Sequence, residues 1–281
     1  MPSLTINDHE MYYEIHGQGD PVVCMGGWGT YCHGNETLLA RGLTDEYQVL
    51  VFDYRGIGNS SDNLHVEPTM AMHANDLIAL LDHLGWQKVH MIGLIGMGCC
   101  VAQELAIHRP DLVRSMVNMG AWAYCDSHLY DQLKLFRDVH RDSGFFAFQK
   151  FVSLYSFLPE YYSKNRDRLL GPEGGWKELN NNYQTHERLV EACLNHDVRD
   201  RLGQINAPCL IIHAAKDLVT GPRTTFPIEK QLPNAQGVTM EEVAHVVAGR
   251  EQKLIKIFGA GYCGDCIPAQ FSGADAFYAV F

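Results

Sequence analysis

The chain has 281 residues, of which 46% are apolar, and a formal net charge of −11 that arises from 33 acidic and 22 basic residues. Such a chain can bury an extensive core, and an acidic chain without a basic run is poorly suited to bind nucleic acid or an anionic membrane. We therefore expect a globular protein whose partner is a neutral or weakly charged small molecule, with no nucleic-acid or membrane partner. The sequence leaves homo-oligomerisation open.

Targeting segments and metal sites are not expected. The start, MPSLTINDHE, has no cationic segment followed by an apolar stretch, and no run reaches about 18 apolar residues, so we expect a cytoplasmic protein. The nine cysteines are scattered and odd in number, which favours reduced thiols. The C-x-x-C at Cys263 and Cys266 lacks a second ligand pair for zinc. We accordingly predict no metal and no cofactor.

The first half of the chain alternates between strand and helix patterns. Two short alternating segments, 4–7 and 11–15, predict an antiparallel hairpin. Buried-type strands are predicted at 21–25, 47–53, 88–93 and 112–119, with helices at 33–43, 69–84 and 98–108 between them. This alternation predicts an α/β fold whose mostly parallel sheet carries helices on both faces.

The second half interrupts this alternation with a helical segment rich in aromatic residues, and strands return at 208–213 and 237–240, each followed by a helix at 226–232 and 246–258. We expect one α/β core from residues 1–123 and 204–260, a helical cap from residues 124–203, and a C-terminal extension, 261–281, without an assigned role. Open α/β sheets bind ligands at the carboxyl ends of their strands, so the cap is expected to cover that edge.

Residues 89–106, VHMIGLIGMGCCVAQELA, combine a strand, a glycine-rich turn and a helix. This is the setting of the G-x-S-x-G nucleophile elbow of α/β-hydrolases. Alignment on the helix and Gly98 puts the nucleophile position at Gly96, whereas alignment on Gly93 puts it at Ile95. Neither register supplies a Ser, Cys or Asp. The sequence predicts a hydrolase-like site that cannot form an acyl-enzyme.

Four motifs, in this order and spacing, resemble the α/β-hydrolase superfamily, and within it the capped meta-cleavage-product hydrolases and enol-lactonases. They are MGGWGT at 25–30, FDYRGIGNS at 52–60, the elbow, and HAAKD at 213–217 with EEVAHVV at 241–247. The resemblance implies an eight-stranded-type sheet with an inserted helical cap. The family often has His-Gly in the first motif, where this chain has Met25-Gly26-Gly27.

The resemblance also assigns catalytic roles. Asp217 matches the acid and His245 the base of the family's triad, in which the carboxylate fixes the imidazole tautomer and the imidazole moves protons. The implied oxyanion hole consists of the backbone amides of Met97 and of Gly27 or Trp28.

Two aromatic residues are expected to contact the substrate. Trp122 falls just beyond a predicted strand, where the family lines its pocket, and Phe148 belongs to the aromatic-rich cap. Most other aromatic residues of the cap are expected to form the core of a helical layer, because only a minority can line a cavity.

Three interpretations of the glycine at the elbow stay open. The first is an engineered replacement of a serine by Gly96. That replacement does not explain Leu94, which stands where a small residue is needed, or Cys99, which stands where a further small residue is common. The second is an enzyme in which His245 and Asp217 deprotonate water or an acidic C–H or O–H, giving hydrolysis of an activated carbonyl compound such as a β-diketone, lactone or vinylogous ester, or lyase or decarboxylase chemistry. The third is a non-catalytic binding protein, similar to the N-myc downstream-regulated proteins. The retained dyad favours the enzyme.

Overall fold

The computed structural model describes residues 3–29, 33, 39 and 42–246. An eight-stranded sheet has the order β1-β2-β4-β3-β5-β6-β7-β8. The strands are β1 (Ser3–Ile6), β2 (His9–His16), β3 (Asp20–Met25), β4 (Tyr47–Phe52), β5 (Val89–Gly93), β6 (Val113–Met119), β7 (Cys209–Ala214) and β8 (Ala235–Met240). Strand β2 pairs antiparallel with β1 and β4, and all later pairs are parallel. The predicted hairpin and mostly parallel sheet are confirmed.

The central strands are apolar along their whole length. Every residue of β5 and of β7 is buried, which is the pattern of parallel strands covered on both faces. Strand β8 lies at the edge, and most of its residues are partly or fully exposed. The core therefore centres on β3, β4, β5, β6 and β7.

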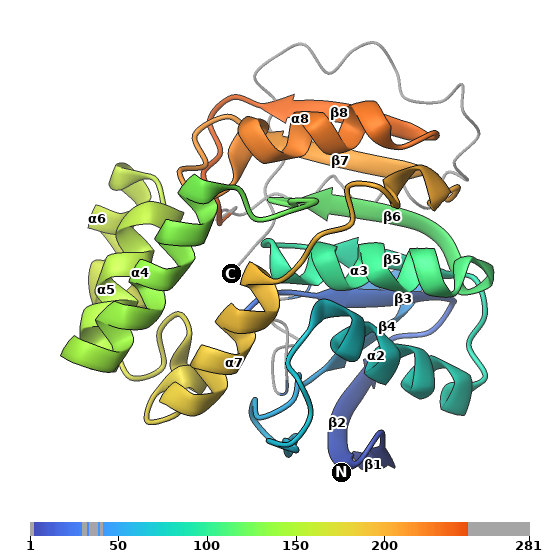
Figure 1. The fold of residues 1–281 in the computed structure, drawn as a ribbon, viewed down its shortest axis with the longest axis horizontal. Coiled ribbons are helices and arrows are strands. Elements are labelled where there is room, and N and C mark those ends of the chain that lie inside the picture. The colour runs from blue at the N-terminus through green and yellow to red at the C-terminus, as the bar shows by residue number, and fades with distance from the viewer. Residues whose placement is uncertain (1–2, 30–32, 34–38, 40–41, 247–281) are drawn as a thin grey trace.

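Three helices cover one face of the sheet (Figure 1). Helices α2 (Met70–Leu84) and α3 (Met97–His108) pack against each other, and α8 (Gly221–Gln231) packs on β7 and β8. The short α1 (Leu43–Glu46) precedes β4. The helices predicted at 33–43 and 246–258 lie largely outside the described residues.

Helix α8 begins earlier than predicted. It starts at Gly221 and not at residue 226, and it contains Pro227 in its interior. Proline favours the first turn of a helix and disrupts its interior, so the sequence pattern suggested a later start. Pro222 occupies the first turn instead.

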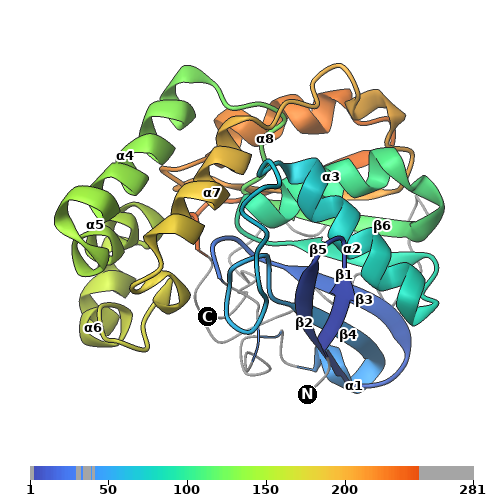
Figure 2. The ribbon, with the colours of Figure 1, turned by 60° about the horizontal axis from the view of Figure 1, so that its bottom comes forward.

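Four further helices follow one another between β6 and β7 and form a group beside the sheet (Figure 2). They are α4 (Ser127–Ser143), α5 (Phe145–Ser156), α6 (Pro159–Leu169) and α7 (Tyr183–Leu194). The Asp126 side chain caps the first of them by accepting from Leu129 N–H. No helix in the described part of the chain combines the length and apolarity that a membrane crossing needs.

Candidate active site

The turn between β5 and α3 holds both candidate nucleophile positions. Ile95 has φ 60° and Gly96 has φ 62° and ψ −86°, and α3 begins at the next residue, Met97. Two successive residues with positive φ are unusual. The φ and ψ of Gly96 are values that glycine alone adopts without strain. Ile95 and Gly96 both line the cavity described below, and neither carries a nucleophilic atom.

The other glycines of the turn are fixed by close backbone approach. A Cβ on Gly98 would lie 2.4 Å from Met25 O at the end of β3, and a Cβ on Gly93 would lie 2.8 Å from Cys99 Cα. The elbow is thus packed directly against the core strands. Burial raises the pKa of the Cys99 thiol to about 12, so this cysteine is not a thiolate at neutral pH.

Asp217 and His245 form a hydrogen-bonded pair. Asp217 follows β7 and His245 follows β8, and His245 Nδ1 lies 2.9 Å from Asp217 Oδ2. Asp217 Oδ1 accepts from the N–H groups of Val219 (2.7 Å) and Thr220 (3.0 Å). Thr220 Oγ1 donates to Asp217 Oδ2 at 2.7 Å and also lies 3.3 Å from His245 Nδ1. Both carboxylate oxygens of Asp217 therefore accept hydrogen bonds in addition to the contact with the imidazole.

These contacts determine the charge of the acid. Burial by itself would raise the pKa of the Asp217 carboxyl, but attraction to His245 and the hydrogen bonds from His245 and Thr220 lower that pKa to about 2. Asp217 is therefore ionised at neutral pH. With Nδ1 engaged by the carboxylate, Nε2 is the nitrogen that His245 can present to a ligand.

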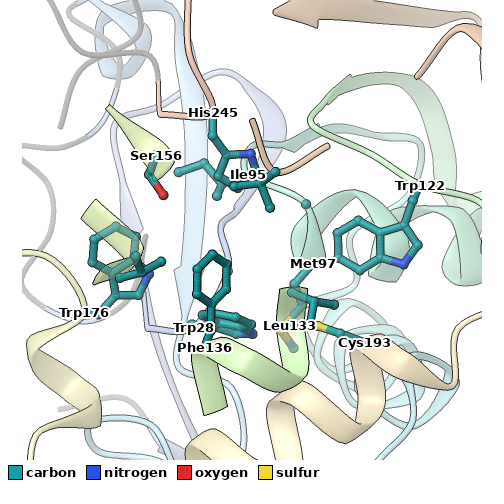
Figure 3. A pocket seen from close by; sticks show the side chains of 14 residues that line it. Trp28, Ile95, Met97, Trp122, Leu133, Phe136, Ser156, Trp176, Cys193 and His245 are labelled. Carbon is teal, nitrogen blue, oxygen red and sulfur yellow. The ribbon is translucent and has the colours of Figure 1, made fainter. Parts of the chain in front are cut away.

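A cavity lies between the carboxyl ends of the strands and the helical group (Figure 3). The sheet side contributes Gly27, Trp28, Ile95, Gly96, Met97, Trp122, Val219 and His245. The helical group contributes Leu133, Phe136, Val152, Ser156 and Cys193, and the connection between α6 and α7 contributes Trp176. None of these described lining residues is Asp, Glu, Lys or Arg, so the wall is mostly apolar and aromatic.

The residues whose backbone amides are expected to bind an oxyanion all line this cavity. Met97 is the first residue of α3, so its N–H has no acceptor within the helix. A Cβ on Gly27 would lie 3.8 Å from Met97 N, which places the loop after β3 against the elbow. Trp28 follows with φ 48° and lines the same cavity.

Of the two expected substrate contacts, the structure places one at the cavity. Trp122 lines the wall next to Gly96. Phe148 does not line it: the ring is fully buried and packs on Trp28, with ring centroids 6.2 Å apart, and on His186, at 4.5 Å. In this structure Phe148 belongs to the layer behind the wall.

Two residues of the site had not been singled out in the sequence. Thr220 stands three residues after Asp217, a spacing at which its N–H and hydroxyl reach back to the carboxylate, so its role was detectable. Ser156 lies in the helical group 89 residues before His245, and no motif marks it. Its place at the cavity depends on how the helices fold back over the sheet.

The comparisons with known proteins agree with this architecture. The sequence model of the alpha/beta hydrolase fold family matches residues 20–249. A protein of Azorhizobium caulinodans named "Putative carbamate hydrolase RutD" is 27% identical over 269 residues, which cover 94% of this chain and 99% of that protein. A protein of the same name from Stutzerimonas stutzeri is 29% identical over 231 residues, 80% of this chain and 86% of that one.

Solved structures show the same fold. MGS-M2, an alpha/beta hydrolase enzyme from a Medee basin deep-sea metagenome library, has a TM-score of 0.78 at 23% identity, with 87% of this chain and 90% of that chain covered. The enol-lactonase from Burkholderia xenovorans LB400 has a TM-score of 0.75 at 21% identity, with 85% and 91% covered. Together with the family match over most of its length, this shows that the chain belongs to the alpha/beta hydrolase fold family.

Proposed function

We propose that this protein hydrolyses a small activated carbonyl compound by direct attack of water, without a covalent intermediate. The observation that carries the proposal is His245, which lines a cavity together with the side-chain-free elbow residue Gly96 and lies 2.9 Å from Asp217. A general base is thus present and a protein nucleophile is absent from the elbow. Relatives named as hydrolases and the shared fold support an enzyme over a binding protein.

The reaction can be written with the groups at the site. A water next to His245 Nε2 attacks the carbonyl carbon, and its proton passes to Nε2 as the new C–O bond forms. The negative charge that develops on the carbonyl oxygen is stabilised by the N–H groups of Met97 and of Gly27 or Trp28. The intermediate then expels its leaving group, which takes the proton back from His245. Asp217 stays ionised and stabilises the imidazolium.

The leaving group must be good, because no acyl-enzyme divides the reaction into two easier steps. A β-diketone, a lactone or a vinylogous ester meets this requirement, since the departing carbanion or enolate is stabilised. Carbamates join the candidates because relatives carry that name. The described lining offers no cationic side chain for an anionic substrate, which favours an uncharged one.

The test is a turnover screen with lactones, β-diketones, vinylogous esters and carbamates on wild type and His245→Ala. We expect His245→Ala to lower kcat by about 10²- to 10⁴-fold with KM nearly unchanged, because proton transfer belongs to the transition state. The exposed His65 provides the matched control, and His65→Ala should keep the wild-type rate.

Two results would contradict the proposal. Full turnover by His245→Ala would show that His245 is not the general base. An acyl-enzyme detected by intact mass spectrometry during turnover would show that water does not attack the substrate directly. A wild type that binds members of the panel and turns none of them over would support the non-catalytic interpretation instead.

A further inference from the structure

Ser156 is a buried polar residue that no contact within the described structure explains. It is the last residue of α5, its exposed fraction is 0%, and its hydroxyl has no hydrogen-bond partner among the described residues. Serines in helices commonly bond the carbonyl one turn back, and Ser156 does not. An unsatisfied buried hydroxyl costs about 1–3 kcal/mol, and this one belongs to a residue of the cavity wall, where a bound molecule could satisfy it.

The position of Ser156 relative to the base is defined by the backbone. Val246 N–H donates to Ser156 O at 2.9 Å, which ties the end of α5 to the segment that carries His245. Figure 3 shows Ser156 beside His245, with Trp122 across the cavity. Among the described lining residues, Ser156 carries the only hydroxyl. Thus the two polar side chains lie on the same side of the cavity.

We propose that the Ser156 hydroxyl holds the attacking water against His245; this inference rests on the proposed function. The water donates one hydrogen to His245 Nε2 and the other to Ser156 Oγ, and one of its lone pairs then points at the carbonyl carbon. Only the proton shared with Nε2 is transferred, and Ser156 keeps its own. In a serine hydrolase the nucleophile is covalently fixed at the elbow, whereas a free water must be oriented by two groups, and a misplacement near 1 Å can cost about 10²-fold in rate.

Helix α5 provides a matched control. Ser153 is also 0% exposed and its hydroxyl also has no partner among the described residues, but it does not line the cavity. Removing either hydroxyl should leave the midpoint of denaturation unchanged or raised, because an unsatisfied buried polar atom is lost. A loss of function confined to Ser156→Ala would therefore not be a folding defect.

The kinetic test compares Ser156→Ala, Ser153→Ala and His245→Ala on the best substrate of the panel. We expect Ser156→Ala to lower kcat by about 10- to 100-fold with KM unchanged, and Ser153→Ala to match wild type. A rise in KM at constant kcat would overturn the inference, because it would mean that Ser156 binds substrate. A wild-type rate in Ser156→Ala together with a loss in His245→Ala would overturn the inference and leave the proposed function intact.

A binding measurement tests the inference without turnover. Aryl trifluoromethyl ketones hydrate to gem-diols, in which one hydroxyl stands where the attacking water would be. By ¹⁹F NMR titration we expect wild type and Ser153→Ala to bind the gem-diol equally, and Ser156→Ala to bind it about tenfold more weakly, the loss of one neutral hydrogen bond. Equal affinity in all three, or no binding of the gem-diol by wild type, would overturn it.

Discussion

The indole ring of Trp122 occupies the space in which a side chain on Gly96 would begin. A Cβ built on Gly96 would lie 2.6 Å from Trp122 Cζ3 and 3.3 Å from Cη2. Real Cβ atoms do not approach other atoms so closely, so the ring of Trp122, which is only 3% exposed, would have to shift. The glycine and the tryptophan therefore form a matched pair, and the Trp122 ring fills the space next to the elbow.

This contact predicts a large cost for restoring serine. Gly96→Ser should lower the free energy of unfolding by about 2 kcal/mol or more, since overpacking costs about 1–3 kcal/mol and a side chain at this positive φ adds strain of the same order. Urea denaturation measures it. In the Trp122→Ala background the same substitution should cost less, with a coupling energy of about 1–3 kcal/mol.

An unchanged midpoint in Gly96→Ser, or equal costs in the two backgrounds, would contradict the packing argument. The variant should also hydrolyse p-nitrophenyl esters poorly, because the new hydroxyl can enter only by displacing the ring. Brisk ester hydrolysis with a serine acyl-enzyme visible by mass would show that the site lacks only its hydroxyl.

Fluorophosphonate probes should leave the wild-type protein unlabelled. These probes react with activated serines, and Gly96 offers none, while burial raises the pKa of Cys99 to about 12. Intact mass spectrometry after long incubation checks this. Stoichiometric labelling of Ser156 would show that it is a nucleophile and not a holder of water.

Much of this fold was predictable because its signals are local. The buried strands β5 and β7 are apolar runs of the length that parallel strands need, and glycines mark the turn into α3. The predicted start of α8 at residue 226 was too late because a proline such as Pro227 is typical of the first turn of a helix. In the structure Pro222 occupies the first turn and Pro227 lies inside the helix. Propensity cannot choose between two prolines so close together.

The site residues differ in the same way: local motifs mark some of them, and the packing of helices places the others. The Asp217–His245 pair could be placed from motifs, since both residues follow strands whose carboxyl ends meet at one edge. Phe148 and Ser156 could not be sorted, because whether a helical side chain faces a cavity depends on how α5 packs over the sheet. Phe148 turns toward Trp28 and His186, and Ser156 turns toward the cavity.

Thr220→Val should remove one of the hydrogen bonds that hold the Asp217 carboxylate. Its hydroxyl donates to Asp217 Oδ2 at 2.7 Å and valine keeps its shape, so we expect a loss of about 1–3 kcal/mol of stability and a decrease in kcat of about tenfold. Thr224→Val is the control, since that hydroxyl donates to Ala121 O away from the dyad. If both variants lose similar stability and only Thr220→Val has a lower kcat, the role of Thr220 is confirmed. Equal kcat values in the two variants would exclude a role for Thr220 in proton transfer.

The stability contributed by Asp217 should depend on pH in the acid range. Its pKa in the folded protein is about 2, below the ordinary value of 3.8, so the folded state favours the carboxylate. That preference stabilises the fold fully above about pH 4 and is lost as the pH falls through 2, and the shift corresponds to about 2 kcal/mol. Other carboxylates titrate in the same range, but they are common to wild type and Asp217→Asn, so the difference between the two isolates this group. Urea denaturation between about pH 6 and pH 2 should show a wild-type advantage of about 2 kcal/mol that shrinks toward the acid end. A difference that stays constant over that range would mean that His245 and Thr220 do not hold the carboxylate in its charged form.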